Sequence, residues 1–383
     1  MTMDAMTQKI AQEFPQRANL QYFNHAAMGP WPLRTQQAVT QFASQCGPDL
    51  LQHWPNWYAK ENTLRETIGR LIGAPDGGRN ITMTKNTSEG LSMIASGLAW
   101  REGDEVLTLA EEFSSNRWSW QQCTPASVKV VEVKRSPNQA PHEALIQHGN
   151  PNTRLIAVST VQYVSGTALN LPQLSDYCRE NDILLVIDAI QSLGALPLDI
   201  SQTPVDAVAC GSHKWLLAAE GLGFLYTSEA LRQELRQRQA GWRMVPDPFQ
   251  FPANASARAI DGRGLEAGTL NTMGMLALSA SLSVYEEVGA SEVLRRIKRN
   301  TSYIMEAANT LGLPLATPED PAQQSGIVSL KHREASKTPM LFNQLSAAGA
   351  VCSMRGGYLR ISPHYSTPME HIESLCQQIS KHL

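Results

Sequence analysis

The chain has 383 residues, of which 42% are hydrophobic and 17% are charged, and its formal net charge is −3. This composition is typical of a globular protein with a large core, and the length exceeds that of one ordinary domain. The slightly acidic balance, without a basic arm or stripe, argues against nucleic acid as a partner.

The six cysteines show no CxxC pair and no regular interval, which is typical of reduced thiols rather than of a disulfide framework. Residues 1–18 are polar and lack the apolar stretch of a signal peptide, and no apolar run approaches the length of a membrane span. We therefore expect a cytoplasmic protein that binds no membrane. We expect no metal site either.

The first part of the chain predicts helices and loops. Helices are expected at 4–17, 33–46 and 56–73. A glycine and two prolines make 22–32 a loop, and the tryptophan-rich segment 52–57 separates the second helix from the third.

Strands and helices then alternate along the chain. Short apolar runs rich in β-branched residues predict strands at 81–84, 105–109, 128–132, 155–160, 183–188, 205–209 and 224–227. Runs between them predict helices at 88–100, 114–122, 140–148, 172–181 and 190–194. This order is typical of an α/β fold with a mostly parallel, doubly wound sheet, in which ligands bind at the carboxyl ends of the strands.

The order of elements changes after residue 273. Two long helices are expected at 273–288 and 291–311, followed by strands at 326–331, 349–354 and 358–362 and a final helix at 368–381. We therefore expect two domains. The large cofactor-binding domain would span 20–288, and a small α+β domain would combine 1–19 with 289–383.

Two polar residues follow neighbouring strands. Asp188 ends the strand at 183–188, and Lys214 comes shortly after the strand at 205–209. A carboxylate can keep a pyridine nitrogen protonated, and a buried lysine amine can form an imine with an aldehyde. Such a pair suits pyridoxal 5′-phosphate. The alternatives are a helix N-cap for Asp188 and a surface lysine for Lys214.

Further residues at strand ends could complete a cofactor site. Thr87 and Ser88 open a helix after a strand, where N–H groups and hydroxyls can bind a phosphate, although an N-cap without a ligand is commoner. Phe113 could stack on the pyridine ring or belong to the core. Tyr163 and Gln191 could reach the ring hydroxyl, or Gln191 could be an exposed helix residue.

Arg360 lies inside an apolar strand, where a guanidinium needs a partner. A substrate α-carboxylate bound by two parallel hydrogen bonds would supply one, and a structural ion pair is the competing interpretation. Arg355 is a weaker candidate for the same task. Thr269 provides a further hydroxyl at a glycine turn, which by itself is typical of an ordinary loop.

Taken together, five motifs resemble the class V aminotransferase family of pyridoxal-phosphate enzymes, which have the aspartate-aminotransferase-like fold (fold type I). In order they are Thr-Ser-Glu-Gly at 87–90, Asp-x-x-Gln at 188–191, Ser-His-Lys at 212–214, Glu-Ala-Gly-Thr at 266–269 and Leu-Arg-Ile-Ser at 359–362. The resemblance covers nearly the whole chain. That family includes cysteine desulfurases, selenocysteine lyases, kynureninases and isopenicillin N epimerase-like proteins.

The resemblance implies a role for each matched residue. Thr87 and Ser88 would hold the phosphate, and Ser212 and His213 would line the phosphate side. Phe113 would cover the pyridine ring, Asp188 would pair with its nitrogen, and Gln191 and Tyr163 would lie near its hydroxyl. Lys214 would carry the aldimine, and Arg360 would bind the substrate carboxylate. Thr269 would reach the phosphate of a neighbouring subunit, which implies a homodimer with shared active sites. His25 and the loop at 54–57 would form walls on the substrate side.

Two departures from the family bear on function. Cysteine desulfurases carry a mobile loop with a persulfide-forming cysteine before the carboxylate-binding arginine, and the run from 349 to 360 is too short for it. Cys352 would instead be a buried thiol in a strand. Where desulfurases tend to have asparagine, this chain has Tyr163, as in kynureninases and epimerase-like members.

We therefore expect an enzyme that acts on a small amino acid, with Lys214 as the base at Cα. Transamination comes first because no dedicated leaving-group site is evident. The alternatives are a C–S or C–Se β-lyase, an epimerase, a cysteine desulfurase, and a protein that binds the cofactor without catalysis.

Overall fold

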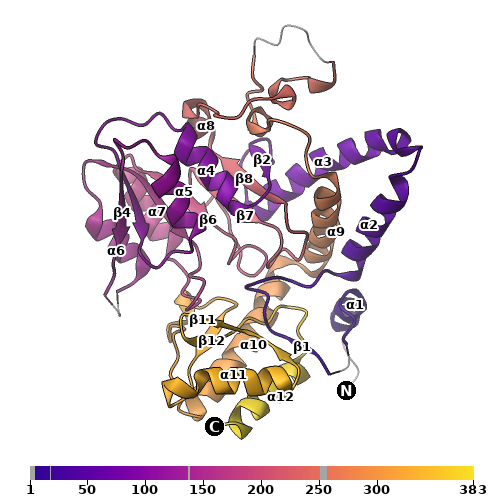
Figure 1. Cartoon of the computed structure of the whole chain (residues 1–383), viewed down its shortest axis with the longest axis vertical. Helices are drawn as coiled ribbons and strands as arrows, with labels where there is room; N and C mark the ends of the chain where they lie inside the picture. Colours follow the sequence, from indigo (N-terminus) through magenta and orange to yellow (C-terminus); the bar gives the residue numbers. More distant parts are fainter. Residues whose placement is uncertain (1–4, 18, 137–138, 251–256) are drawn as a thin grey trace.

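A seven-stranded sheet forms the centre of the computed structural model, which describes residues 5–17, 19–136, 139–250 and 257–383. The strand order is β2-β8-β7-β6-β5-β3-β4. The strands are β2 (Ile81–Thr84), β3 (Glu105–Leu109), β4 (Lys129–Val133), β5 (Thr153–Ser159), β6 (Leu184–Asp188), β7 (Ala207–Gly211) and β8 (Gly223–Thr227). Neighbouring strands are parallel except at β8, which is antiparallel to both β2 and β7. The predicted mostly parallel sheet is confirmed (Figure 1).

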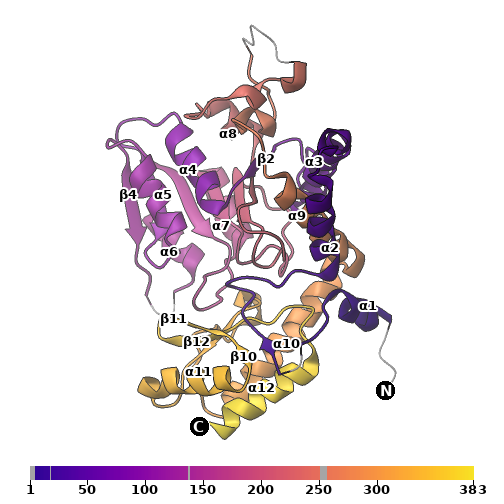
Figure 2. The same ribbon diagram turned by 45° about the vertical axis from the view of Figure 1, so that its right-hand side comes forward.

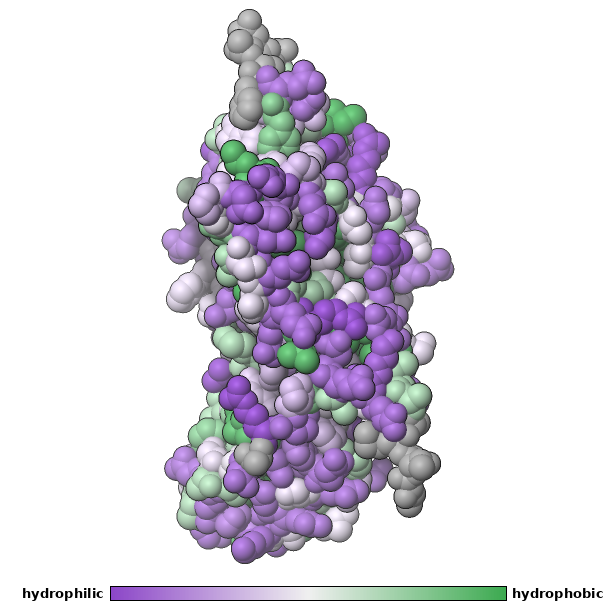
Figure 3. Space-filling model, turned by 90° about the vertical axis from the view of Figure 1, so that its right-hand side faces the viewer, coloured by the Kyte–Doolittle hydropathy of each residue, from purple (hydrophilic) through white to green (hydrophobic). Residues whose placement is uncertain are grey.

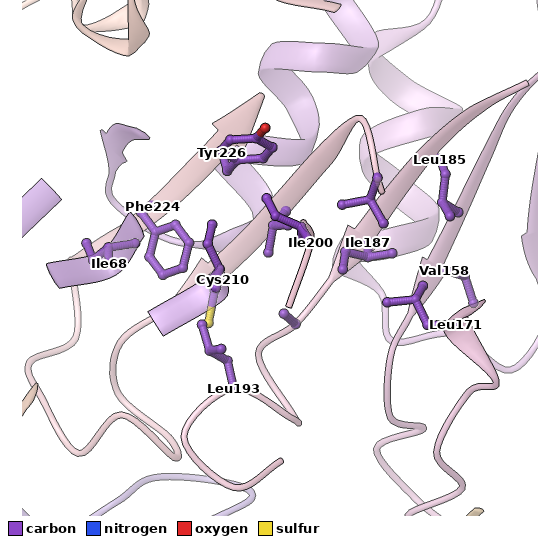
Figure 4. Close-up of a cluster of buried hydrophobic side chains, with 14 of the residues drawn as sticks. Ile68, Val158, Leu171, Leu185, Ile187, Leu193, Ile200, Cys210, Phe224 and Tyr226 are labelled. Carbon is purple, nitrogen blue, oxygen red and sulfur yellow. The ribbon is translucent and has the colours of Figure 1, made fainter. Parts of the chain in front are cut away.

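Helices pack on both faces of this sheet. One face contacts α3 (Leu50–Ile72), α6 (Pro141–His148), α7 (Leu171–Glu180) and α9 (Thr272–Val288), and the other contacts α4 (Thr87–Gly97), α5 (Ser115–Cys123) and α8 (Glu229–Glu234). Successive strand residues point to opposite faces, so Ile187 lies in the first core and Val186 in the second. Figure 4 shows part of the first core, in which Phe224 of β8 lies near Ile68 of α3. Burial on both faces explains why β6, β7 and β8 are almost uniformly apolar in sequence.

The C-terminal elements gather at one end of the molecule (Figures 1 and 2). They are α10 (Ala290–Thr310), β9 (Val328–Leu330), α11 (Thr338–Ala347), β10 (Ala350–Val351), β11 (Ser353–Arg355), β12 (Tyr358–Ile361) and α12 (Met369–Lys381). Near the other end of the chain, β1 (Gln21–Tyr22) pairs in parallel with β10, and Phe23 is buried in the same core as Leu359. The division into domains of 20–288 and 1–19 with 289–383 stays a prediction.

Helices α1 (Ala5–Glu13) and α2 (Leu33–Gln45) lie on the side of α9. The residues before α1 lie outside the described part, so the start of the helix predicted at 4–17 is not tested at residue 4. Figure 3 shows the adjoining face, where hydrophilic side chains dominate and hydrophobic ones are scattered. In the described ranges of the chain, no helix combines the length and the apolar character that a membrane span requires.

Three local predictions were wrong. The helix expected at 190–194 is a series of turns, because Gly194 has φ of 96° and lies against the backbone of Trp215. The loop expected at 52–57 belongs to α3, where Trp57 is buried against Phe42 despite Pro55 within the helix. The strand expected at 349–354 is divided at Cys352 into β10 and β11, which pair with different strands.

Candidate active site

Asp188 and Lys214 meet at the carboxyl edge of the parallel strands. Asp188 is the last residue of β6, and Lys214 follows the adjacent parallel strand β7 by three residues. Both line one cavity of about 400 Å³ together with Phe113, which follows β3, and Tyr163, which follows β5. The topology therefore brings together four predicted residues that are far apart in sequence.

The two ionisable groups perturb each other in a buried setting. Asp188 is 2% exposed, and its Oδ1 accepts a hydrogen bond from the backbone N–H of Ile190 at 2.9 Å. Burial raises the pKa of Asp188 to about 6, although Ile190 and Lys214 act in the opposite direction. Burial lowers the pKa of Lys214 to about 8, and the Asp188 carboxylate opposes that change. A lysine of this kind loses its proton near neutral pH, as a nucleophile or base must.

Helix α4 begins at the same edge of the sheet, because β2 runs parallel to β7 and ends just before it. Asn86 caps the helix by accepting a hydrogen bond from the Glu89 N–H at 2.9 Å. The Thr87 hydroxyl accepts one from the Gly211 N–H at 3.0 Å, and Ser88 donates one to Ser115 at 2.8 Å. Asn86, Thr87, Ser88 and Ser115 line the cavity. The N-terminus of α4 therefore borders it, together with the hydroxyl-bearing side chains of Thr87, Ser88 and Ser115.

Aromatic and cationic side chains complete the cavity wall. The ring of Phe113 packs edge-on against Tyr163 at 5.3 Å between centroids, and Lys214 Nζ lies 5.5 Å from the Phe113 centroid. Arg360 is 1% exposed and donates from Nη1 to the Tyr163 carbonyl oxygen at 2.8 Å. Its Nε is buried and has no hydrogen-bond partner among the described residues. Burial and the charge of Arg355 lower the pKa of Arg360 to about 10.

Gln191 and His213 also line the cavity, as predicted from sequence. The Gln191 amide is held by two protein partners: Nε2 donates to the Ala26 carbonyl at 3.0 Å, and Oε1 accepts from the Trp215 indole at 3.1 Å. Burial and Lys214 lower the pKa of His213. Gln191 therefore has a fixed orientation, with one amide hydrogen left for a ligand.

Five predicted residues lie outside this cavity: Ser212, Thr269, Trp54, Trp57 and His25. The Ser212 hydroxyl is fully buried and donates within its own turn, to the Ala219 carbonyl at 2.6 Å. Thr269 lines a separate hollow with Lys85, and Trp54 and Trp57 line another beside α3.

His25 is also displaced from the cavity. It is 3% exposed and stacks on His364 at 4.8 Å between centroids, and the hollow that it lines is the one beside Trp31. Burial lowers its pKa to about 4. Its placement thus gives no support to the expected contact with substrate in this chain.

Sequence reasoning missed other cavity residues. Asn86 could have been found as an N-cap, since asparagine before a helix is a common signal. Ser115 begins α5 two residues after Phe113, and Ala26 and Ala27 follow β1 far away in sequence; none of the three carries such a signal. Glu112 is a buried carboxyl behind this site, and burial cannot be read from its neighbours in sequence.

Comparison with known proteins identifies the family. The sequence profile of the class V aminotransferases matches residues 22–370. The chain belongs to this family. Among its relatives, isopenicillin N epimerase of Streptomyces clavuligerus is 27% identical over 93% of both chains. A probable cysteine desulfurase of Methanothermobacter thermautotrophicus is 25% identical over 98% of both.

A solved structure shares the fold of this class V chain. It is a C-DES mutant with glycine covalently linked to its PLP cofactor, with a TM-score of 0.87, 24% sequence identity and coverage of 99% of both chains. The α/β architecture of fold type I is thus confirmed. The family and this fold imply pyridoxal phosphate as the cofactor.

The cavity fits such a cofactor. The α4 N-terminus offers N–H groups and hydroxyls to a phosphate, Asp188 offers a buried carboxylate to a ring nitrogen, and Lys214 offers an amine to an aldehyde. The volume of about 400 Å³ lies within the range of small-molecule sites.

Proposed function

We propose that this class V enzyme is a pyridoxal-phosphate-dependent aminotransferase that acts on a small amino acid. The convergence of Lys214, Asp188 and Arg360 on one cavity is the observation that carries the proposal. Pyridoxal phosphate, when bound, supplies an electron sink for the pair of electrons left at Cα.

Each residue then has a task that its environment suits. Arg360 binds the substrate α-carboxylate, which gives its buried Nε a partner and fixes the Cα–H bond relative to the cofactor ring. Lys214 removes the Cα proton, since its lowered pKa, about 8, makes the unprotonated amine far more abundant near neutral pH than in an ordinary lysine. Asp188 holds a proton at the ring nitrogen, and Phe113 covers the ring. Thr87, Ser88 and the α4 N-terminus bind the phosphate.

The fate of the Cα proton separates the candidate reactions. A base that delivered the proton to the bound cofactor would complete transamination, and one that returned it to Cα would restore an amino acid. Lys214 is the only lysine among the described residues that line the cavity. His213 and Tyr163 also line the cavity and are able to exchange a proton, so epimerisation stays an alternative, and transamination is proposed first because it requires no base besides Lys214.

A C–S β-lyase is the second candidate, because C-DES, whose fold the chain shares, is described as a cystine C–S lyase. Desulfuration through a cysteine persulfide is disfavoured. Cys352 is 7% exposed, and burial raises the pKa of its thiol to about 12. Its chain continues into a tight β11–β12 hairpin turned by Gly356 and Gly357, which leaves no room for a mobile loop. A buried, protonated thiol is a poor nucleophile.

The test uses the purified holoenzyme and a panel of amino acids. We expect conversion of bound cofactor to pyridoxamine phosphate together with an equal amount of 2-oxo acid, and regeneration by a second 2-oxo acid. Lys214→Ala should lower turnover by about a hundredfold or more and abolish the visible band that borohydride removes. Lys331→Gln, which removes a lysine outside the cavity, is the matched control. Pyruvate and sulfide without pyridoxamine phosphate would replace the aminotransferase proposal by the β-lyase.

A further inference from the structure

Two arginines of the β11–β12 hairpin line the candidate active site. Ser353 of β11 pairs with Arg360 of β12, and Arg355 lies two residues further along β11. Directly paired residues, and residues two apart on one strand, share a face of the sheet. Arg355 and Arg360 are therefore diagonal neighbours on one face, with about 7–8 Å between them at the backbone.

The two guanidinium groups occupy different depths. Arg360 is buried at 1% exposure, whereas Arg355 is exposed and its Nη1 donates only to the backbone carbonyl of Met354, at 3.0 Å. Within the described ranges, no carboxylate forms an ion pair with either arginine. Both lie close enough to Lys214 for their charges to lower its pKa. The cavity thus has an inner and an outer cation.

The outer arginine is held in place by the turn that follows it. Gly356 and Gly357 adopt φ of 55° and 78°, a conformation that glycine accepts without strain. A Cβ at Gly356 would lie 3.0 Å from Val164, so the turn packs against the loop that carries Tyr163. Arg355 therefore belongs to a short, packed hairpin rather than to a long loop.

The charges of the cavity select the substrate. Asp188 is the only carboxylate among the described residues that line it, against Lys214, Arg355 and Arg360. Asp188 is committed to the ring nitrogen in the proposed function, which leaves the substrate side cationic. A basic side chain would be repelled there, and a neutral one would leave Arg355 without an anionic partner.

We propose that the substrate is an amino dicarboxylic acid, with its α-carboxylate on Arg360 and its side-chain carboxylate on Arg355. This inference rests on the proposed function, because it takes Arg360 as the site of the α-carboxylate. Arg355 lines the cavity and has no carboxylate partner among the described residues, so a substrate carboxylate can accept charge-assisted hydrogen bonds from its guanidinium. A substrate with the length of aspartate or glutamate would extend from the inner cation towards the outer one.

The experiment measures binding rather than turnover. The holoenzyme is titrated with aspartate, glutamate, alanine and 2-aminobutyrate, and the change in its visible absorption gives a dissociation constant for each. We expect the acidic pair to bind more tightly than the neutral pair. Arg355→Gln should lower the ratio of acidic to neutral affinity by about 2- to 10-fold, because water partly screens the pair that an exposed arginine forms.

Lys331→Gln is the matched control for charge. Lys331 follows β9 in the same sheet, and its Nζ lies 4.1 Å from the centroid of the Tyr358 ring, so it is outside the residues that line the cavity. The affinity ratio should be unchanged in this variant. Arg360→Gln should weaken acidic and neutral amino acids alike. A parallel thermal-shift measurement with succinate and propionate checks the preference with ligands that cannot react.

The outcomes separate the two proposals. Equal affinity for acidic and neutral amino acids, or an Arg355→Gln ratio that matches the Lys331→Gln ratio, would overturn the dicarboxylic substrate and leave the aminotransferase intact. If no amino acid of either class altered the spectrum, the proposed function would fail first, and the substrate class with it.

Discussion

Glu112 places a second buried carboxyl behind the candidate active site. It is 6% exposed, and its Oε1 accepts a hydrogen bond from the Ser159 N–H at 2.7 Å, while the Ser159 hydroxyl donates to Oε2. Ser159 is the register partner of Asp188 on the neighbouring strand. Burial raises the pKa of Glu112 to about 7, and the charge of Asp188 adds to this effect. The protein thus holds two carboxyl groups that resist ionisation next to each other.

Glu112→Gln should make stability less dependent on pH. The folded-state pKa of Glu112, about 7, lies above its ordinary value of 4.5, so between these values the folded state binds more protons than the unfolded state. Stability is therefore lost as pH rises through this window, by about 3 kcal/mol for a carboxyl in this position. The glutamine variant lacks this loss and should exceed the wild type in its urea midpoint at pH 8 but not at pH 4.5.

The control for this prediction is Glu102→Gln, at an exposed position away from Asp188. Its urea midpoints should follow those of the wild type at both pH values. A Glu112→Gln variant with the wild-type pH dependence would mean that Glu112 ionises normally in the folded protein.

At the scale of elements, a buried charge cluster holds the loop that contains Thr269. Glu266 has no exposed side-chain surface, and its Oε1 lies 2.7 Å from Arg65 of α3 and accepts from the Met83 N–H of β2 at 2.8 Å. Glu61 and Arg243 complete the cluster, with 2.6 Å between them. The loop is therefore tied to α3 and to the sheet by ions that are almost completely shielded from water.

Glu266→Gln should unfold the protein at markedly lower urea. The substitution leaves two buried arginines with one carboxylate, and breaking a buried pair in this way costs about 3–5 kcal/mol. Asp176→Asn is the matched comparison, because Asp176 pairs with Arg179 on the surface, with 62% and 65% of the side chains exposed. That variant should change stability by less than about 1 kcal/mol. Equal shifts in the two variants would argue against a structural role for the buried cluster.

The same scale shows what the sequence could predict. Apolar runs such as 105–109 predicted their strand without error, because both faces of the sheet are buried and the pattern is local. The proximity of Asp188 and Lys214 could be predicted because the carboxyl ends of neighbouring parallel strands lie at the same edge of a sheet. The conformations of 52–57 and 190–194 and the position of His25 could not be predicted, because each depends on a contact between segments that are distant in sequence. These contacts join Trp57 to Phe42, Gly194 to Trp215, and His25 to His364. Helix α11 also went unpredicted.

At the scale of the whole molecule, Thr269 raises the question of a second subunit. The sequence resemblance predicts that it serves a neighbouring active site, and in the single chain it lines a hollow with Lys85 and Glu89, not the cavity of Lys214. Asn271 caps α9 just beyond it, so the loop is fixed at both ends. The homodimer with shared sites stays a prediction.

Mixed dimers of Lys214→Ala and Thr269→Val subunits test this arrangement. If Thr269 acts across the interface, one site of each mixed dimer combines both substitutions, and the other has neither. Random mixing then leaves about a quarter of all sites intact, and that share should bind cofactor at limiting concentration and show the visible band. If Thr269 serves its own subunit, every site carries one defect. The mixture would then bind no more cofactor than the average of the two unmixed variants, and the shared-site dimer would be wrong.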